Sequence, residues 1–257
     1  MTTTSYPSDL SDLQWSIIQE ILQDTRKRKW SFRMILNSIF YVVKGGIQWR
    51  MLPKDMPPWQ TVYYYFRKWR LDGTWDLLHE ELHLKCRVQC NRALSPSVGL
   101  VDSQSVKTSL LGGIRGFDAG KKVKGIKRQI VVDTLGLLLA IVVHRADISD
   151  KRGGNFLLQR LYKHITIFPR LVKFFADQAY RSLTETIGQI SRRWKMEIVK
   201  RPKGSKGFVL LSKRWIVERT FAWLSSHRRL EKNFERKIPN HETMVKIAMI
   251  RIMIRRF

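Results

Sequence analysis

The sequence predicts an α/β protein in which an all-helical N-terminal region precedes a mixed sheet with flanking helices. In the N-terminal region, apolar side chains recur at helical spacing. A polar, proline-containing segment at 91–99 breaks that periodicity, and beyond it apolar runs of strand length alternate with helical segments. These observations predict a helical domain over residues 1–91 and an α/β domain over residues 92–257.

Four helices are expected in the N-terminal region. The first opens with Ser11 and Gln14 at the spacing of a capping box, and the second stops at Gly45 and Gly46, a good C-terminal signal. The expected ranges are 11–22, 31–46, 59–71 and 74–86. Short helices of this kind fit a helix-turn-helix-like module.

The helix expected at 59–71 is the candidate DNA-reading helix. Five polar side chains along it have the length and chemistry to reach base edges or phosphates. They are Gln60, Thr61, Tyr64, Arg67 and Lys68. The alternative is a plain helical bundle in which the tyrosines and tryptophans of this segment fill the core.

Beyond the boundary the pattern changes to strands. The run VGLVDSQSV predicts one strand, and RQIVVDTLGLLLAIVVHR predicts two more, joined by a turn at 133–136. A helix over 153–163, the strand LVKFFAD, a helix over 182–193, the strand MEIVKR and a helix around residue 218 follow. Three adjacent strands followed by helix, strand, helix, strand and helix form the layout of a ribonuclease H-like fold with a five-stranded mixed sheet.

Three carboxylates stand where a charge is hard to explain structurally. Asp102 and Asp177 each end an apolar run, which places them at the C-terminal ends of strands, the edge where α/β sheets present their chemistry. Glu218 lies in RWIVERTFAWL, where a helix is apolar almost all round, so we expect a carboxylate on a buried face. Alternatively, each aspartate is a turn or capping residue, and Glu218 pairs with Arg214 one helical turn earlier.

The chain is strongly basic, with 48 Lys and Arg against 21 Asp and Glu and a formal charge of +27. Residues 93–257 hold 34 of the basic and 12 of the acidic residues, so most of the charge lies in the region of the three carboxylates. Double-stranded DNA is the partner that such a charge favours. A ribosome-like binder would also be basic, but it would not need buried acids. We therefore interpret the three acids as a metal site.

Membrane and nucleotide functions are not expected. No apolar run approaches the length of a membrane span, and the polar start MTTTSYPSD has no signal-peptide pattern, so the expected compartment is the cytoplasm. Gly120 and Lys121 lack the upstream glycine of a P-loop, which argues against nucleotide binding.

Five long segments occur in a fixed order: GIQWRMLPKDMPPWQTVYYYFRKW, VDSQSVKTS, GFDAGKKVKGIKRQIVVDTLGLLLAIVVH, ADQAYRS and RWIVERTFAWL. Together they closely resemble transposases of small bacterial insertion sequences, of insertion sequence family five within the DDE group. The resemblance covers residues 5–240 or so. It implies a transposase that binds its terminal inverted repeats at the bacterial nucleoid, with a catalytic and metal-binding triad of Asp102, Asp177 and Glu218.

That resemblance also implies a chemistry. Two Mg²⁺ ions about 3.5–4 Å apart, with Mn²⁺ as a substitute, would activate a water and stabilise the leaving oxygen. Asp102 would bridge both ions, Asp177 would hold one and Glu218 the other. A transposon 3′-hydroxyl would then replace water for strand transfer. Joining two transposon ends implies a homodimer or a larger assembly on DNA.

One signature of the family is half present. It consists of tyrosine, two residues, arginine, three residues, glutamate, six residues and lysine. Arg214 and Glu218 fit it, whereas Leu211 and Ser225 stand where the tyrosine and lysine would be. We expect Arg228 or Arg229, one turn later, to take the phosphate-contact role of that lysine.

Two basic loops are expected to hold DNA phosphates. The cations assigned to DNA outside the reading helix are Lys121, Lys122, Lys124, Lys127, Arg128, Arg201, Lys203, Lys206, Arg214, Arg228 and Arg229. Asp118 in the first loop and Asp150 before the helix at 153–163 are the acids most easily mistaken for triad members.

Two other functions stay open on the sequence. A metal-dependent nuclease of the same fold would cut DNA and never join it. A non-catalytic DNA-binding regulator would keep the N-terminal module but would have no use for the three acids.

Overall fold

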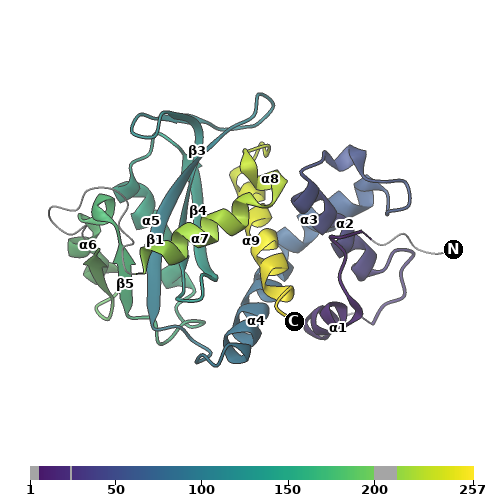
Figure 1. Cartoon of the computed structure of the whole chain (residues 1–257), viewed down its shortest axis with the longest axis horizontal. Helices are drawn as coiled ribbons and strands as arrows, with labels where there is room; N and C mark the ends of the chain where they lie inside the picture. Colours follow the sequence, from purple (N-terminus) through teal and green to yellow (C-terminus); the bar gives the residue numbers. More distant parts are fainter. Residues whose placement is uncertain (1–5, 24, 200–212) are drawn as a thin grey trace. The chain divides into compact units, whose positions relative to one another are not determined.

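The structure, a computed structural model, describes residues 6–23, 25–199 and 213–257 (Figure 1). The chain forms two compact units. The helical unit comprises Met1–Cys86, Leu224–Glu231 and Thr243–Phe257, and the sheet unit comprises Arg87–Trp223 and Lys232–Glu242. Two segments from the C-terminal part of the chain thus belong with the N-terminal helices. The functional domains expected over 1–91 and 92–257 stay a prediction.

The helical unit contains the four predicted helices. The Ser11 side chain accepts from Gln14 N in the expected capping box, and Gly46 ends the second helix with a left-handed φ of 76°. A Cβ at Gly46 would lie 2.8 Å from Arg228 Cβ, so only glycine fits there. The elements are α1 (Asp12–Leu22), α2 (Phe32–Gly45), a 3₁₀ turn (Trp49–Met51), α3 (Trp59–Leu71), most of α4 (Thr74–Gln89), α8 (Arg228–Glu231) and most of α9 (Ile238–Ile254).

The core of this unit forms where α2, α3 and α4 meet. Phe40 and Phe66 are fully buried, and the Trp75 indole N–H donates to Phe66 O at 3.1 Å. The α9 segment is held by an ion pair between Lys246 and Asp76 and by many buried apolar side chains. It is therefore a core helix of this unit. Within the described ranges, no helix is long and apolar enough to cross a membrane.

The sheet unit has the predicted order of strands and helices. Among the described residues its sheet has six strands, where the sequence predicted five, because a short strand lies in the stretch predicted as a basic loop. That strand has three residues, too few to show a periodicity. The strands are β1 (Val98–Lys107), β2 (Gly116–Asp118), β3 (Val123–Val132), β4 (Leu138–Arg145), β5 (Lys173–Ala176) and β6 (Lys195–Ile198). β1, β3 and β4 pair antiparallel, whereas β1, β5 and β6 pair parallel.

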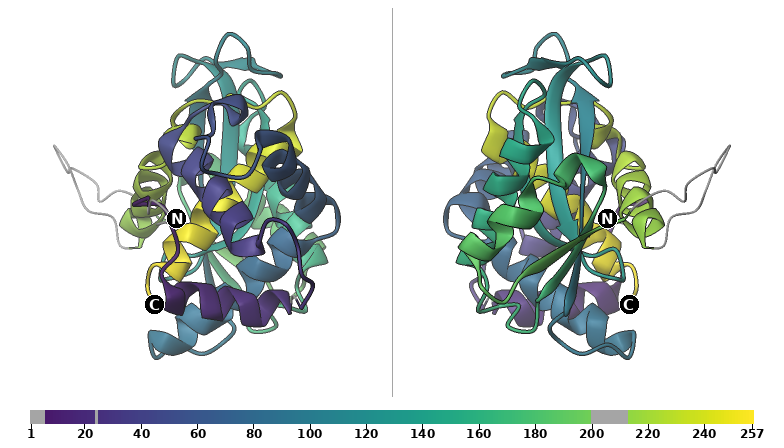
Figure 2. Two further views of the ribbon diagram at one scale, coloured as in Figure 1. Left: turned by 90° about the vertical axis from the view of Figure 1, so that its right-hand side faces the viewer. Right: turned by 90° about the vertical axis from the view of Figure 1, so that its left-hand side faces the viewer.

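Helices lie on both faces of this sheet (Figure 2). Leu157, Leu158 and Leu161 of α5 (Asp150–Lys163) pack with Val131 and Phe174 in the core of one face, together with α6 (Leu183–Ile190). The opposite face carries α7 (Arg214–Ser225). α5 begins one turn earlier than predicted, because the Ser149 side chain accepts from Arg152 N at 3.3 Å and caps it.

The turn between β3 and β4 fixes α7 in place. Gly136 adopts a left-handed φ of 80°, and its carbonyl accepts from Thr220 Oγ1 at 2.9 Å. Arg219 of α7 donates to Leu135 O in the same turn at 3.1 Å. The helix that carries Glu218 is therefore anchored at this turn.

Asp133, predicted as a turn residue, organises the same turn. Its Oδ1 accepts from Leu135 N and Leu137 N, both at 2.9 Å, and its other oxygen pairs with Arg87. Both Arg87 and Asp133 are buried, so removing one partner leaves an uncompensated charge in the core.

We expect Arg87→Ala to lower the free energy of unfolding by about 3 kcal/mol or more, because Asp133 loses its counter-ion. Arg145→Ala is the matched control. Its pair with Asp147 is exposed, so its loss should cost less than about 1 kcal/mol. Urea denaturation measures both, and equal costs for the two variants would contradict the assigned role of the buried pair.

Candidate active site where strands β1 and β5 pair

Asp102 and Asp177 lie side by side at one edge of the sheet. β1 and β5 are parallel, and Val101 pairs with Ala176, so the next residue of each chain segment is an aspartate. Both line one small pocket, together with Leu100, Phe175, Val199, Arg214 and Val217. The two aspartates singled out from the sequence therefore share one pocket.

The environment of Asp102 disfavours its charge. Burial raises the pKa of Asp102 to about 6, and the neighbouring Asp177 carboxylate also raises it. The Ser103 backbone N–H, which donates to Asp102 Oδ1 at 2.7 Å, and the Arg214 and Lys121 cations act in the opposite direction. A half-buried pair of like charges on neighbouring strands is the pattern of a functional site.

Asp177 also has a structural role. It caps a 3₁₀ turn (Gln178–Tyr180), with Oδ1 accepting from Ala179 N at 3.0 Å. The capping interpretation and the functional interpretation of this residue are thus compatible, because a carboxylate has further lone pairs to offer.

Glu218 is not on a buried face, contrary to the expectation from sequence. Its side chain is 48% exposed, and Oε1 lies 3.1 Å from Arg214 Nε, as in the alternative interpretation. The prediction failed because the apolar residues around Glu218 do not all face the core. Trp215 is exposed, and the Arg219 guanidinium lies 4.6 Å from the centre of its ring.

The donor set fits a hard divalent cation, although the three acids are not gathered. Asp102 and Asp177 offer adjacent carboxylate oxygens, the ligands that Mg²⁺ prefers, and their mutual repulsion would be relieved by a cation. Within the described part of the chain, no group of three His, Cys, Asp or Glu side chains is close enough to hold a metal ion. Glu218 instead pairs with Arg214, which lines the same pocket as the two aspartates.

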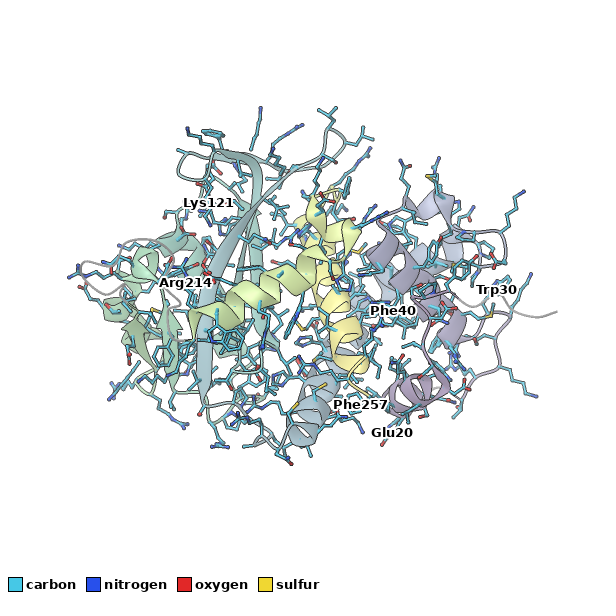
Figure 3. All side chains as sticks on the ribbon, viewed as in Figure 1. Glu20, Trp30, Phe40, Lys121, Arg214 and Phe257 are labelled. Atoms are coloured by element: carbon cyan, nitrogen blue, oxygen red, sulfur yellow. The ribbon has the colours of Figure 1, made fainter. Side chains whose placement is uncertain are left out.

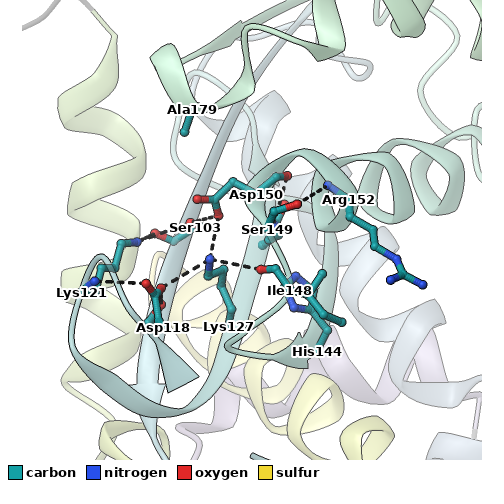
Figure 4. Close-up of polar contacts among 12 residues, drawn as sticks. Ser103, Asp118, Lys121, Lys127, His144, Ile148, Ser149, Asp150, Arg152 and Ala179 are labelled. Atoms are coloured by element: carbon teal, nitrogen blue, oxygen red, sulfur yellow. Dashed lines mark hydrogen bonds and ion pairs between the residues drawn. The ribbon is translucent and has the colours of Figure 1, made fainter. Parts of the chain in front are cut away.

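Lys127 is buried between the two acids that most resemble triad members (Figure 4). Its ammonium lies 3.4 Å from Asp118 and 3.3 Å from Asp150. Asp150 also accepts from Ser103 Oγ at 2.8 Å. Both acids thus have structural partners, and the predicted phosphate contact of Lys127 is corrected, because its ammonium is enclosed in the sheet unit.

Arg128 is likewise corrected from a DNA contact to a core residue. It is fully buried, where Nε donates to His241 Nε2 at 2.8 Å and a terminal nitrogen donates to Gln104 Oε1 at 3.2 Å. Burial lowers the pKa of the Arg128 guanidinium to about 9. The position of β3 explains both errors, since a strand inside a sheet is buried on both faces and every residue from 125 to 132 is buried.

Three other lysines of the stretch predicted as the first basic loop are exposed, namely Lys121, Lys122 and Lys124. Lys121 Nζ donates to Ser103 O at 3.1 Å, so a cation lies beside the strand that carries Asp102 (Figures 3 and 4). Ser103 was missed by the sequence interpretation. Its signal was the polar run from Asp102 to Ser105, which follows the apolar run inside β1.

The remaining candidate DNA-contact residues and signature positions lie in different surroundings. Gln60, Tyr64, Arg67 and Lys68 of α3 are exposed and Thr61 is half-buried, with Lys68 paired to Asp72 at 2.8 Å. Arg228 is exposed, whereas Arg229 is buried and donates to Ile47 O at 3.1 Å. Arg201, Lys203, Lys206 and Leu211 lie outside the described residues.

A mixed sheet with one acid inside β1, a second directly after the parallel neighbour β5 and a third on a later helix defines the ribonuclease H-like class of DNA-processing domains. Comparison with known families agrees with this class. The family described as transposase DDE domain matches residues 93–253, and the family described as putative transposase of IS4/5 family matches residues 10–79. The chain belongs to the DDE transposase family, which confirms the predicted fold and family.

Two relatives come from Burkholderia cepacia. An uncharacterized 16.2 kDa protein of insertion element IS402 is 32% identical over 38% of this chain and 72% of its own length. A putative transposase for insertion sequence element IS402 is 33% identical over 48% of this chain and 60% of its own length. The chain therefore matches less than two thirds of that second relative.

The raised pKa of Asp102 predicts a dependence of stability on pH. The folded chain holds this proton more tightly than the unfolded chain, whose aspartates titrate near about 3.9. The associated stability is present below that value and is lost as the pH rises through about 6. In EDTA at neutral pH, the free energy of unfolding of Asp102→Asn should be about 1–2 kcal/mol higher than that of the wild type. At pH 4 the two free energies of unfolding should be nearly equal.

Asp147→Asn is the control for this measurement. Asp147 is exposed and the Arg145 guanidinium lowers its pKa, so its amide variant should show no gain at neutral pH. Denaturant titrations across the pH range separate the two cases. A pH profile of Asp102→Asn parallel to that of the wild type would show that burial does not disfavour the Asp102 charge.

Proposed function

We propose that this protein is a DNA transposase that binds the terminal inverted repeats of its insertion sequence, cleaves strands in a metal-dependent reaction and transfers a 3′-hydroxyl into target DNA. The observation that carries the proposal is the adjacent pair of Asp102 and Asp177 in one pocket of a strongly basic chain. Neither a purely structural role nor DNA binding alone calls for two repelling carboxylates at that edge.

Asp102, Asp177 and Glu218 are the proposed metal-holding and catalytic residues. Bound Mg²⁺, or Mn²⁺ in its place, supplies an activated water or hydroxyl and stabilises the leaving oxygen. Asp102 offers its oxygens from within β1, and Asp177 offers its oxygens from directly after the neighbouring strand β5. Glu218 lies on a helix that is anchored at the β3–β4 turn. It pairs with Arg214, which lines the same pocket as the two aspartates.

Cations around the pocket are proposed to hold the DNA backbone. Arg214 lines the pocket itself, where it offsets the repulsion among the acids and has the forked geometry that fits a phosphate. Lys121, Lys122 and Lys124 are exposed on the loop whose Lys121 reaches Ser103. Lys127 and Arg128 are left out of this set because they are buried.

Recognition of the terminal repeats is assigned to α3 in the helical unit. Gln60, Tyr64, Arg67 and Lys68 recur at three- and four-residue spacing, so they share one exposed stripe of the helix. The opposite side is occupied by buried Val62, Phe66 and Trp69. The proposal includes at least a dimer on DNA, because two ends have to be joined, and a cytoplasmic location at the nucleoid, where the DNA is.

Glu218→Gln should abolish chemistry and leave binding intact. With Mg²⁺ and a labelled duplex carrying the element's ends, wild type should nick the ends and join them to target DNA. The variant should bind within about twofold of wild type, while cleavage and joining both fall by on the order of a thousandfold. Asp147→Asn, a carboxylate outside the pocket, should behave as wild type.

Each other outcome has a definite meaning. If wild type and Glu218→Gln bind equally and neither cuts with Mg²⁺ or Mn²⁺, the protein is a DNA-binding regulator. If wild type cuts and never joins a pre-cut end with a free 3′-hydroxyl, the protein is a nuclease. If Glu218→Gln is as active as wild type, the third acid has been wrongly assigned.

Arg67→Ala should weaken binding to end DNA and unrelated DNA alike, and it should reduce the slope of log Kd against log salt concentration by about 1. Gln60→Ala should weaken binding to end DNA alone, by about 1–3 kcal/mol. Lys163→Ala, on α5 in the sheet unit, is the charge-matched control. Fluorescence anisotropy in EDTA measures all four proteins, and equal slopes for Arg67→Ala and wild type would exclude α3 from the interface.

A further inference from the structure

An apolar tip is exposed directly after β1. Leu110 is 91% exposed and Leu111 is 76% exposed, and Ile114 and Phe117 are exposed beside them in the sequence. Single exposed apolar residues are common, but four within eight residues form a local apolar surface. Such surfaces mark sites of interaction.

The tip, defined here as residues 109–117, has a fixed base. Ser109 N donates to Asn233 O at 2.9 Å, and Gly113 N donates to Glu235 O at 3.2 Å. The two backbones approach so closely that a Cβ on Gly113 would lie 2.0 Å from Arg236 O. The leucines are therefore presented from an ordered support, which lowers the entropic cost of using them in binding.

Buried side chains brace that support from below. His241 Nδ1 lies 2.9 Å from Asn233 Oδ1, and the other ring nitrogen accepts from Arg128 Nε. Asn233 Oδ1 also accepts from Glu235 N at 3.1 Å. Arg128, misassigned to DNA by the sequence interpretation, is thus a positioning residue for the strip that carries the tip.

The surroundings of the tip are basic. Lys107, Arg115, Lys122 and Lys124 are exposed around it. Of the acids nearby, Asp118 is buried beside Lys127, and Asp147, which lies against Gly116, is paired with Arg145. A second copy of a chain of charge +27 would be repelled by this rim. DNA, which offers phosphates to the rim and apolar base faces to the tip, complements both parts of the surface.

We propose that the tip is a wedge that unstacks a base step of the bound DNA, with Leu110 and Leu111 against the exposed bases. This inference rests on the proposed function, since it presumes that the chain binds its element's ends. From Asp102 to Lys107, β1 extends about 17 Å, so the tip lies well away from Asp102 on the same strand. Unstacking there adapts the duplex to the shape of the sheet unit.

The test uses end duplexes in which 2-aminopurine replaces one base at a time, bound in EDTA so that no strand is cut. 2-Aminopurine brightens when it loses its stacking partners. Wild type should raise the fluorescence at one step by about threefold or more, while Leu110→Ser/Leu111→Ser should bind the same duplex without that rise. Leu94→Ser, at a leucine 56% exposed in the same unit, should match wild type.

A duplex with a mismatch at the bright step supplies a second readout. The double variant should lose about tenfold in affinity for the fully paired duplex. It should recover this loss on the mismatched duplex, because the cost of unstacking has been removed. Thermal melts show whether the double variant is folded. If it is not, Leu110→Ser alone gives the same comparison.

Three results would overturn the inference. Equal fluorescence rises for wild type and the double variant would mean that the tip unstacks nothing. A change from dimer to monomer in light scattering, with the fluorescence rise retained, would make the tip a contact between copies. Wild type that binds no end duplex would remove the proposed function itself, and the wedge with it.

Discussion

The parallel pairing of β1 with β5 is the constraint on which the candidate site depends. The two strands of a hairpin run antiparallel, so neighbouring strands point the same way only when a crossover connection joins them. Here α5 provides that crossover, and the register that matches Val101 with Ala176 places Asp102 beside Asp177. A slip of one residue would turn one carboxylate to the other face of the sheet. The apolar core around Phe174 and Leu157 therefore fixes the position of the chemistry as well as the fold.

Burial of charge recurs throughout the sheet unit, and each instance is matched by a partner of opposite charge or by hydrogen bonds. Lys127 lies between Asp118 and Asp150, and Arg87 pairs with Asp133. Asp102 differs from these residues, because burial raises its pKa even though the Ser103 N–H and the Arg214 cation act against the rise. A charge that stays disfavoured in the fold is the pattern expected of a functional site.

Apolar periodicity was enough to predict the helices and the order of the strands, because those features follow from which residues are buried. Asp177 follows the end of β5 as predicted, whereas Asp102 lies inside β1, which continues through a polar run to Lys107. Apolar periodicity failed where burial depends on the partner element. The positive charges of Lys127 and Arg128 indicated DNA, yet their partners Asp118, Asp150 and His241 come from other segments, and no local pattern reveals them. Glu218 was expected to be buried because counting apolar residues around a helix does not show which face packs.

The helical unit has a consequence for how the chain is made. Its core includes residues 243–257, which leave the ribosome long after α1 to α4. The early helices therefore wait with apolar surface uncovered until α9 arrives, since Cys86 of α4 meets Met253 only then. Partial chains are exposed to aggregation and proteolysis during this interval. Synthesis of α9 thus acts as a checkpoint, because a copy that stops before this helix cannot assemble the helical unit.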